Sequence, residues 1–259
     1  MKPSSHVSHF TFHVTMHRFF VSPDAVHDQQ VTLVEEQAHQ IAHVLRLRPG
    51  QMIVALDNAG WEYEVELTQV GRREVMGEVK KRRPVANEPA VSLTLFLALL
   101  KGEKFEWVLQ KGTEIGVSAF APVVTARTVV QVAPNPVKMA RWRRIIQEAA
   151  EQAGRGRRPQ LAEVMTFQEA AGQLERFPLA LAAWEGATGC GVREALAGGA
   201  RPERVALLVG PEGGLEEGEV EMAQAAGARV ITLGRRILRA ETAGIVGAAL
   251  VLHELGEVG

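Results

Sequence analysis

The chain is poor in cysteine and lacks the usual signals of secretion and membrane insertion. Cys190 is the single cysteine among 259 residues, which excludes a disulfide framework and a cysteine-based metal site and suits a reducing cytoplasm. The longest apolar runs, residues 91–100 and 243–252, have about half of the roughly 20 residues that a membrane span needs. The N-terminal segment contains no apolar stretch typical of a signal peptide. We therefore expect a cytoplasmic protein with no membrane partner.

Two common fingerprints of nucleotide sites are also absent. Neither Gly-x-Gly-x-x-Gly nor the glycine-rich P-loop with its lysine occurs, which disfavours a nucleotide-dependent oxidoreductase and an ATP site. The formal net charge is −1 and 46% of the residues are hydrophobic, as is ordinary for a globular protein of one or two domains. A balanced net charge does not exclude nucleic acid as a partner, because the distribution of charge decides that.

Residues 1–17 form a polar segment ahead of the first predicted strand. It carries half of the eight histidines, His6, His9, His13 and His17. A metal site is one interpretation of these histidines, but we favour a polar arm that precedes the folded chain and assign no metal-binding residue.

The rhythm of apolar residues divides the chain into two predicted domains. Residues 18–83 contain one helix and several short strands, two of them separated by the turn Asn58-Ala59-Gly60, which predicts a small β-barrel. Residues 82–90 contain two prolines and no periodicity, and we interpret them as a linker. From residue 91 to 259 apolar strands alternate with amphipathic helices, which predicts an α/β domain with a mainly parallel sheet. One face of the helix in the first domain is expected to hold Ala38, Ile41, Ala42 and Leu45.

Two polar loops follow neighbouring predicted strands of the α/β domain. The first, Gly210-Pro211-Glu212-Gly213-Gly214, lies where α/β sheets bind ligands, and its glycines let the backbone approach one closely. Glu216 and Glu217 come next, at the positive end of a predicted helix, where they would repel a phosphate. The second loop ends in Glu241 and Thr242. A plain turn and a helix cap at either of these two residues are the simpler alternatives to a ligand site.

Basic residues gather in residues 138–158, and a second basic stretch covers residues 80–83. The flexible, arginine-rich part of the first stretch suits a nucleic-acid backbone, and a solvated helix face is the alternative. The last helix, expected over residues 243–255, is apolar nearly all round, and small residues recur on it four positions apart. Such a helix is buried in a core or in a subunit interface, and the sequence alone favours the core.

Six stretches of the sequence together resemble the RsmE-type methyltransferases of the SPOUT superfamily, which methylate uracil N3 in 16S ribosomal RNA. In chain order they are HRFFV, HVLRLRPG, KGEKFEWVLQKGTEIGV, EQAGRGRRPQL, LLVGPEGGL and LGRRILRAETA. The resemblance implies a PUA-like RNA-binding β-barrel over residues 18–83 and, over residues 91–259, a SPOUT-type α/β methyltransferase domain with a C-terminal trefoil knot. It also implies S-adenosylmethionine as the cofactor, 16S rRNA within the small ribosomal subunit as the substrate, and a homodimer formed through the last helix.

The resemblance further implies roles for single residues. The residues expected around the cofactor are Leu208, Gly210, Pro211, Glu212, Gly213, Gly214, Leu233, Gly234, Leu238, Arg239, Ala240, Thr242 and Ala243. Because the N3 proton must leave uracil, an acid–base group and an orienting cation would help, and Glu241 and Arg239 are the catalytic candidates. The residues expected to bind RNA phosphates are Arg18, Arg46, Lys101, Lys104, Arg155 and Arg157.

Two alternatives remain beside this interpretation. One is a non-catalytic RNA-binding or ribosome-assembly factor on the same fold, and the other is methylation of a different rRNA nucleotide. The chain also departs from the family at Thr125-Ala126-Arg127, where many relatives carry Ser-Glu-Arg, so any role of that glutamate is lost.

Overall fold

The structure is a computed structural model that describes residues 16–129 and 134–259. Most histidines of the predicted N-terminal arm lie outside the described residues. The chain divides into two compact units: one holds the described residues up to Leu56 together with Glu62–Arg83, and the other holds Asp57–Trp61 and the described residues from Pro84 to Gly259. No helix within the described ranges is long and apolar enough to cross a membrane.

The first unit is built on a six-stranded sheet in the order β1-β4-β5-β6-β3-β2. Its strands are β1 (Arg18–Phe20), β2 (Val26–His27), β3 (Gln30–Val34), β4 (Met52–Leu56), β5 (Trp61–Val70) and β6 (Glu74–Pro84). β1 pairs with β4 in parallel, whereas β4 pairs with β5, and β3 with β6, in antiparallel fashion. The predicted turn Asn58-Ala59-Gly60 is confirmed, since it joins β4 to β5. Alternate residues of these strands, such as Val31 and Leu33, are fully buried and form the core of the unit.

The helix predicted in this unit changes type part of the way along. α1 (Glu35–His39) continues into a π-helical turn (Gln40–Val44), in which the Leu45 amide donates to the Gln40 carbonyl, five residues earlier. The wider turn rotates the side chains that follow, yet Leu45 from the predicted apolar face still packs against the core that contains Ala38 and Ile41. Ala38 and Ile41 are buried, and Ala42 and Leu45 are half-buried.

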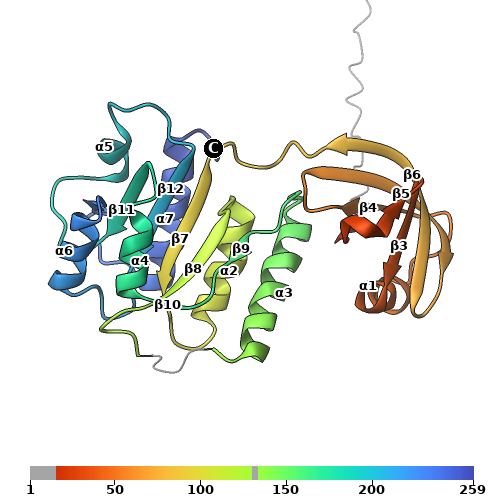
Figure 1. Cartoon of the computed structure of the whole chain (residues 1–259), viewed down its shortest axis with the longest axis horizontal. Helices are drawn as coiled ribbons and strands as arrows, with labels where there is room; N and C mark the ends of the chain where they lie inside the picture. The colour runs from red at the N-terminus through yellow and green to blue at the C-terminus, as the bar shows by residue number, and fades with distance from the viewer. Residues whose placement is uncertain (1–15, 130–133) are drawn as a thin grey trace, which may run out of the picture. The chain divides into compact units, whose positions relative to one another are not determined.

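The second unit has the predicted α/β architecture (Figure 1). Its strands are β7 (Ser92–Ala98), β8 (Ala119–Val124), β9 (Gln160–Leu161), β10 (Met165–Thr166), β11 (Leu179–Ala183), β12 (Arg204–Val209) and β13 (Arg229–Ile231). Its helices are α2 (Lys104–Ile115), α3 (Pro136–Gln152), α4 (Phe167–Leu174), α5 (Val192–Leu196), α6 (Glu217–Ala225) and α7 (Ala240–Glu254). The sheet runs β10-β8-β7-β12-β11-β13, with β9 beside β8, and these strands pair in parallel.

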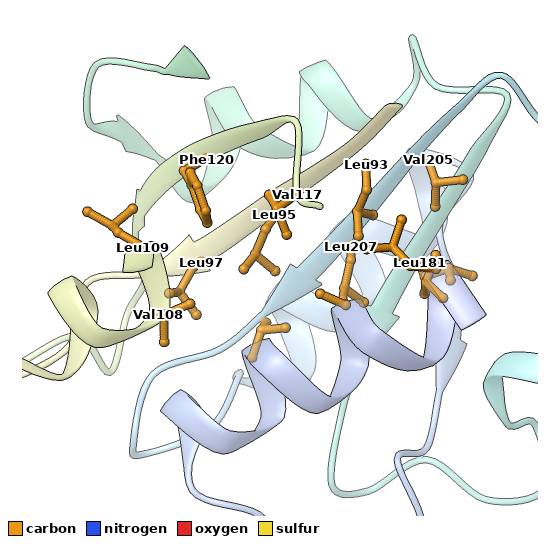
Figure 2. Packing of buried hydrophobic residues seen from close by; sticks show 14 of the residues in the cluster. Leu93, Leu95, Leu97, Val108, Leu109, Val117, Phe120, Leu181, Val205 and Leu207 are labelled. Carbon is orange, nitrogen blue, oxygen red and sulfur yellow. The ribbon is translucent and has the colours of Figure 1, made fainter. Parts of the chain in front are cut away.

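Helices cover both faces of this sheet. Leu95 and Leu97 of β7 point to the layer that contains α2, α3, α5 and α7, and Figure 2 shows Leu97 close to Val108 of α2. Phe96, between them in sequence, points to the opposite layer with α4 and α6. Because successive side chains of a strand alternate between faces, a continuous apolar strand is what a sheet covered on both sides requires.

α7 begins three residues earlier than predicted. Its N-cap is Arg239, which makes no side-chain cap, so the alternative in which Glu241 or Thr242 caps the helix is wrong: both lie inside the first turn. One face of α7 lies directly on the sheet, where a Cβ atom added to Gly247 would come within 3.0 Å of the Leu207 side chain. The small residues on this face of α7 therefore allow close packing in the core, which is the location that the sequence alone favoured.

Candidate functional site

A pocket of about 260 Å³ lies beyond the carboxyl ends of three neighbouring strands, β12, β11 and β13. Residues 183–185 line it at the end of β11, residues 209–215 at the end of β12 and residues 232–238 after β13, while α7 adds Ala240 and Ala243. The carboxyl ends of parallel strands meet at one edge of a sheet, and this is where open α/β sheets hold their ligands. The two loops singled out from the sequence thus come together in one site.

All but three of the predicted cofactor residues line this pocket. Leu208 does not, because it is fully buried among the residues facing α4 and α6. Arg239 and Thr242 are also outside the lining. Sequence reasoning missed Trp184 and Glu185, which follow β11. The signal was present, since the acidic Glu185 follows an apolar strand there, but the position of β11 between β12 and β13 follows from the sheet order and not from the chain order.

The glycine loop is folded too tightly for side chains at two of its positions. Gly214 has φ = 73°, and its amide donates to the Pro211 carbonyl at 3.0 Å. A Cβ atom on Gly210 would lie 3.1 Å from the Leu215 amide nitrogen and 3.2 Å from the Gly214 carbonyl carbon. Because the first position needs a left-handed backbone and the second a close backbone approach, glycine is required at both.

The start of α6 is closed by the protein's own carboxylate. The Glu216 amide donates to Glu219 Oε2 at 3.0 Å, and Glu219 Oε1 accepts from the Ala126 amide at 2.8 Å. Arg127 adds a second link, since its Nη1 donates to the Gly213 carbonyl at 3.0 Å. The positive end of α6 therefore already carries carboxylates, which would repel a phosphate at the loop before it. Ala126 makes this hydrogen bond to Glu219 through its backbone amide, so the bond does not depend on the glutamate side chain that many relatives carry at this position.

Lys104, at the start of α2, contacts both the glycine loop and α7. Its Nζ lies 3.3 Å from Oε1 of Glu212 in the glycine loop and 3.4 Å from Oε2 of Glu241 in the first turn of α7. The Lys101 amide donates to the same Glu212 oxygen at 3.2 Å. Burial raises the pKa of Glu212, but hydrogen bonds from its own amide, from the Lys101 amide and from Lys104 outweigh burial and hold the pKa below its ordinary value. The predicted RNA contact at Lys104 is thus engaged within the protein.

Glu241, the candidate acid–base group, lies largely inside the protein. Its side chain is 13% exposed. Its Oε2 atom is buried and accepts no hydrogen bond from any residue that the structure describes, although the Lys104 ammonium is within ion-pair distance.

Arg155 is not available to RNA, and that prediction is wrong. The residue is 4% exposed, and its Nη1 donates to the carbonyls of Thr113 at 3.1 Å and Val117 at 2.6 Å. Its Nη2 donates to Glu88 Oε2 at 2.9 Å. The guanidinium of Arg155 binds one carboxylate and two backbone carbonyls inside the protein, whereas Arg157, two residues later, is exposed.

The positive charge gathered in the sequence between residues 138 and 158 is largely neutralised in space. The partners are glutamates: Arg141 pairs with Glu106 at 2.7 Å, Arg143 with Glu163 at 2.9 Å and Arg144 with Glu148 at 2.9 Å. A solvated helix face carrying ion pairs, the alternative considered above, describes this part of α3.

The basic residues of the first unit are paired in part as well. Arg18 and Arg83 both form ion pairs with Glu62, and burial of Glu62 raises its pKa while the hydrogen bonds from these two arginines more than reverse that effect. Arg46 is exposed. Of the basic residues predicted to bind RNA, Arg46, Lys101 and Arg157 are the exposed ones.

An open parallel sheet whose strand ends carry a glycine loop and a pocket is the arrangement typical of ligand-binding α/β proteins. Residues 87–252 match the family model described as an RNA methyltransferase domain, which is more than half of the chain. The chain belongs to the RNA methyltransferase family, and the resemblance stated from the sequence is confirmed.

Relatives of known name extend the match over both units. A ribosomal RNA small subunit methyltransferase E from Synechocystis is 34% identical over 244 residues, 92% of this chain and 78% of that protein. The protein of the same name from Bacillus subtilis is 33% identical over 229 residues, 86% of this chain and 90% of its own length. A crystal structure of a ribosomal RNA small subunit methyltransferase E from Neisseria gonorrhoeae, bound to S-adenosyl methionine, aligns with a TM-score of 0.81 at 30% identity and covers 92% of this chain and 97% of that one.

Proposed function

We propose that this protein is an S-adenosylmethionine-dependent methyltransferase that methylates N3 of one uridine in 16S rRNA of the small ribosomal subunit, in the cytoplasm. One observation carries the proposal: a chain of this family places a glycine-lined pocket, beside an acidic helix start, at the carboxyl edge of its sheet. The bound cofactor of the Neisseria relative supports the choice of ligand. No observation favours the non-catalytic alternative, and the pocket argues against it.

The chemistry of the pocket fits this cofactor. S-adenosylmethionine has no phosphate, and its sulfonium and ammonium groups are positive. The pocket offers the exposed carboxylate of Glu185, which has no hydrogen bond or ion pair to another described residue, and closely folded backbone at Gly210 and Gly214. Apolar surface for the adenine ring comes from Leu233, Leu238 and other side chains of the lining.

We assign the chemistry to two residues beside the pocket. The bound cofactor supplies an electrophilic methyl group, and the chain must remove the N3 proton and stabilise the uracil anion. Arg239, at the N-cap of α7, is exposed and is the orienting cation. Glu241 is the acid–base group: it lies in the first turn of the same helix, and its Oε2 accepts no hydrogen bond from the described residues, although it faces the Lys104 ammonium. Lys104 keeps the Glu241 carboxylate in place by their ion pair.

The remaining implications of the family are proposals of the same kind. The six-stranded first unit would be a PUA-like RNA-binding β-barrel with Arg46 among its RNA contacts, and Lys101 and Arg157 would bind RNA from the second unit. The C-terminal chain would form a trefoil knot, a rare exception among folds. This is supported by the insertion of β12 between β7 and β11 and by the return of α7 onto β7 and β12.

A homodimer formed through α7 completes the proposal. The glycine face of the helix is used by the core, but apolar side chains remain on its other side: Leu250 is 36% exposed, and Val246 is half-buried. An apolar strip of this kind on a helix suits a two-fold interface.

Cofactor binding and methyl transfer test the proposal separately. Calorimetric titration should show binding of S-adenosylmethionine and none of NAD. The wild type should transfer labelled methyl to small subunits that lack the modification, whereas Arg239→Ala and Glu241→Gln should bind the cofactor but transfer at least about a hundredfold more slowly, as is typical when an acid–base group is lost. Tight binding of NAD alone, or cofactor binding without transfer by the wild type, would overturn the proposal.

A further inference from the structure

The outer lip of the pocket combines exposed positive charge with an exposed apolar tip. The lip, residues 235–239, follows β13 and contains Arg235, Arg236, Ile237 and Arg239. All four of these side chains are exposed, and residues 235–238 also line the pocket. Ile237 is 87% exposed, more than any other large hydrophobic side chain that the structure describes. A single exposed apolar side chain is ordinary on a protein surface, but Ile237 lines the pocket, so a molecule bound there can cover it.

The arginines of the lip carry uncompensated charge. None of their guanidinium groups has a hydrogen bond or an ion pair to another residue in the described part of the chain. On α3 the opposite holds, since Arg143 and Arg144 each pair with a glutamate. The arginines of the lip therefore differ from these two arginines of α3, whose charge is paired.

The proposed reaction dictates what must lie against the lip. N3 of uracil belongs to the edge that pairs in a double helix, so the base has to be unpaired and turned out to enter the pocket. The nucleotides on either side then present phosphates and unstacked bases at the mouth of the pocket. Arginine binds phosphate in a bidentate manner and stacks on bases, and an aliphatic tip contacts a base or ribose.

We infer that the lip, residues 235–239, is an RNA-docking surface that grips the strand next to the target uridine. Arg235 and Arg236 bind phosphates, and Ile237 covers an unstacked base or ribose. This inference rests on the proposed function, because it takes RNA as the substrate. A second copy of the chain is the competing occupant, but a two-fold axis that passed through the lip would bring its three arginines against their own copies, and like charges brought together in this way repel.

The test pairs two double variants of equal charge. Arg235→Gln with Arg236→Gln removes two unpaired arginines from the lip, and Arg143→Gln with Arg144→Gln removes two paired ones from α3. Binding of a fluorescein-labelled oligouridine is measured against salt concentration at saturating S-adenosylmethionine. The lip variant should lower the slope of log K against log salt by about 1.4, which is two single-strand phosphate contacts, and the α3 variant should leave it unchanged.

Ile237→Ser completes the experiment. It should raise the KM for small ribosomal subunits about tenfold, the effect of losing part of one buried aliphatic side chain, without changing the salt slope. An unchanged slope in the lip variant, or an equal loss in the α3 variant, overturns the inference. So does a lip variant that weakens only cofactor binding, or an Ile237→Ser protein that becomes monomeric with unaltered RNA affinity. Failure of the wild type to transfer methyl despite normal salt-dependent binding refutes the proposed function and not the lip.

Discussion

Replacing Arg155 by methionine should destabilise the second unit without acting on RNA. The side chain of Arg155 is 5% exposed and that of Glu88 20% exposed, so the pair is shielded on both sides. Methionine fills the space of the arginine stem, but it leaves the carboxylate without its cation and the carbonyls of Thr113 and Val117 without donors. Breaking a buried pair in this way costs 3–5 kcal/mol, and because water reaches Glu88 in part we expect about 3 kcal/mol.

For a unit of this size, that loss corresponds to a fall in Tm of about 6–12 °C. Arg157→Met is the matched control: Arg157 is exposed, so its free energy of unfolding should change by less than about 0.5 kcal/mol. Scanning calorimetry measures both variants, and RNA affinity is compared at a temperature at which both are folded. An Arg155→Met protein with unchanged Tm and lost RNA affinity would refute the reasoning and restore Arg155 as an RNA contact.

Three further predictions concern the pocket. Gly210→Ala brings a methyl group within 3.2 Å of rigid loop backbone and should weaken S-adenosylmethionine binding in calorimetry at least about tenfold. Gly218→Ala is the control, because its added Cβ meets nothing within 4 Å. This variant should keep the affinity and gain up to about 1 kcal/mol of stability. Lys104→Met removes the cation between Glu212 and Glu241 and should lower kcat, with Lys104→Arg restoring part of it; equal kcat in both variants would contradict the positioning role. Because the folded-state pKa of Glu212 is depressed, the stability that its ionised form contributes is complete above the unfolded pKa of about 4.3 and is lost as pH falls through the folded pKa. The Tm measured between neutral and acid pH should therefore fall less steeply below a pH of about 4.3 in Glu212→Gln than in the wild type.

The architecture of the second unit could be predicted from the periodicity of its apolar residues, because the patterns of strands and helices are local. The apolar run at residues 91–100 became β7, buried on both faces, and the loops after β12 and β13 met at one edge because the strands are parallel. Glu185 could not be placed with them, since nothing local says that β11 lies between β12 and β13.

Charge could not be interpreted from the sequence in the same way. Arg155 and Arg157 stand in the same glycine-rich stretch, yet one is buried and the other exposed. The difference is made by Glu88, 67 residues earlier, and by carbonyls at the end of α2. Lys104 likewise finds a partner in Glu212, 108 residues away. Ion pairing depends on contacts between distant segments, so a run of basic residues predicts a surface only after its acidic partners are known.

The most direct test of the account is the position of the transferred methyl group. Small ribosomal subunits lacking the modification are incubated with the wild type and labelled S-adenosylmethionine, and the digested 16S rRNA is analysed by mass spectrometry. We predict label at N3 of a single uridine. Label on another base or on a ribose, or no label on 16S rRNA under conditions in which the cofactor binds, would contradict it.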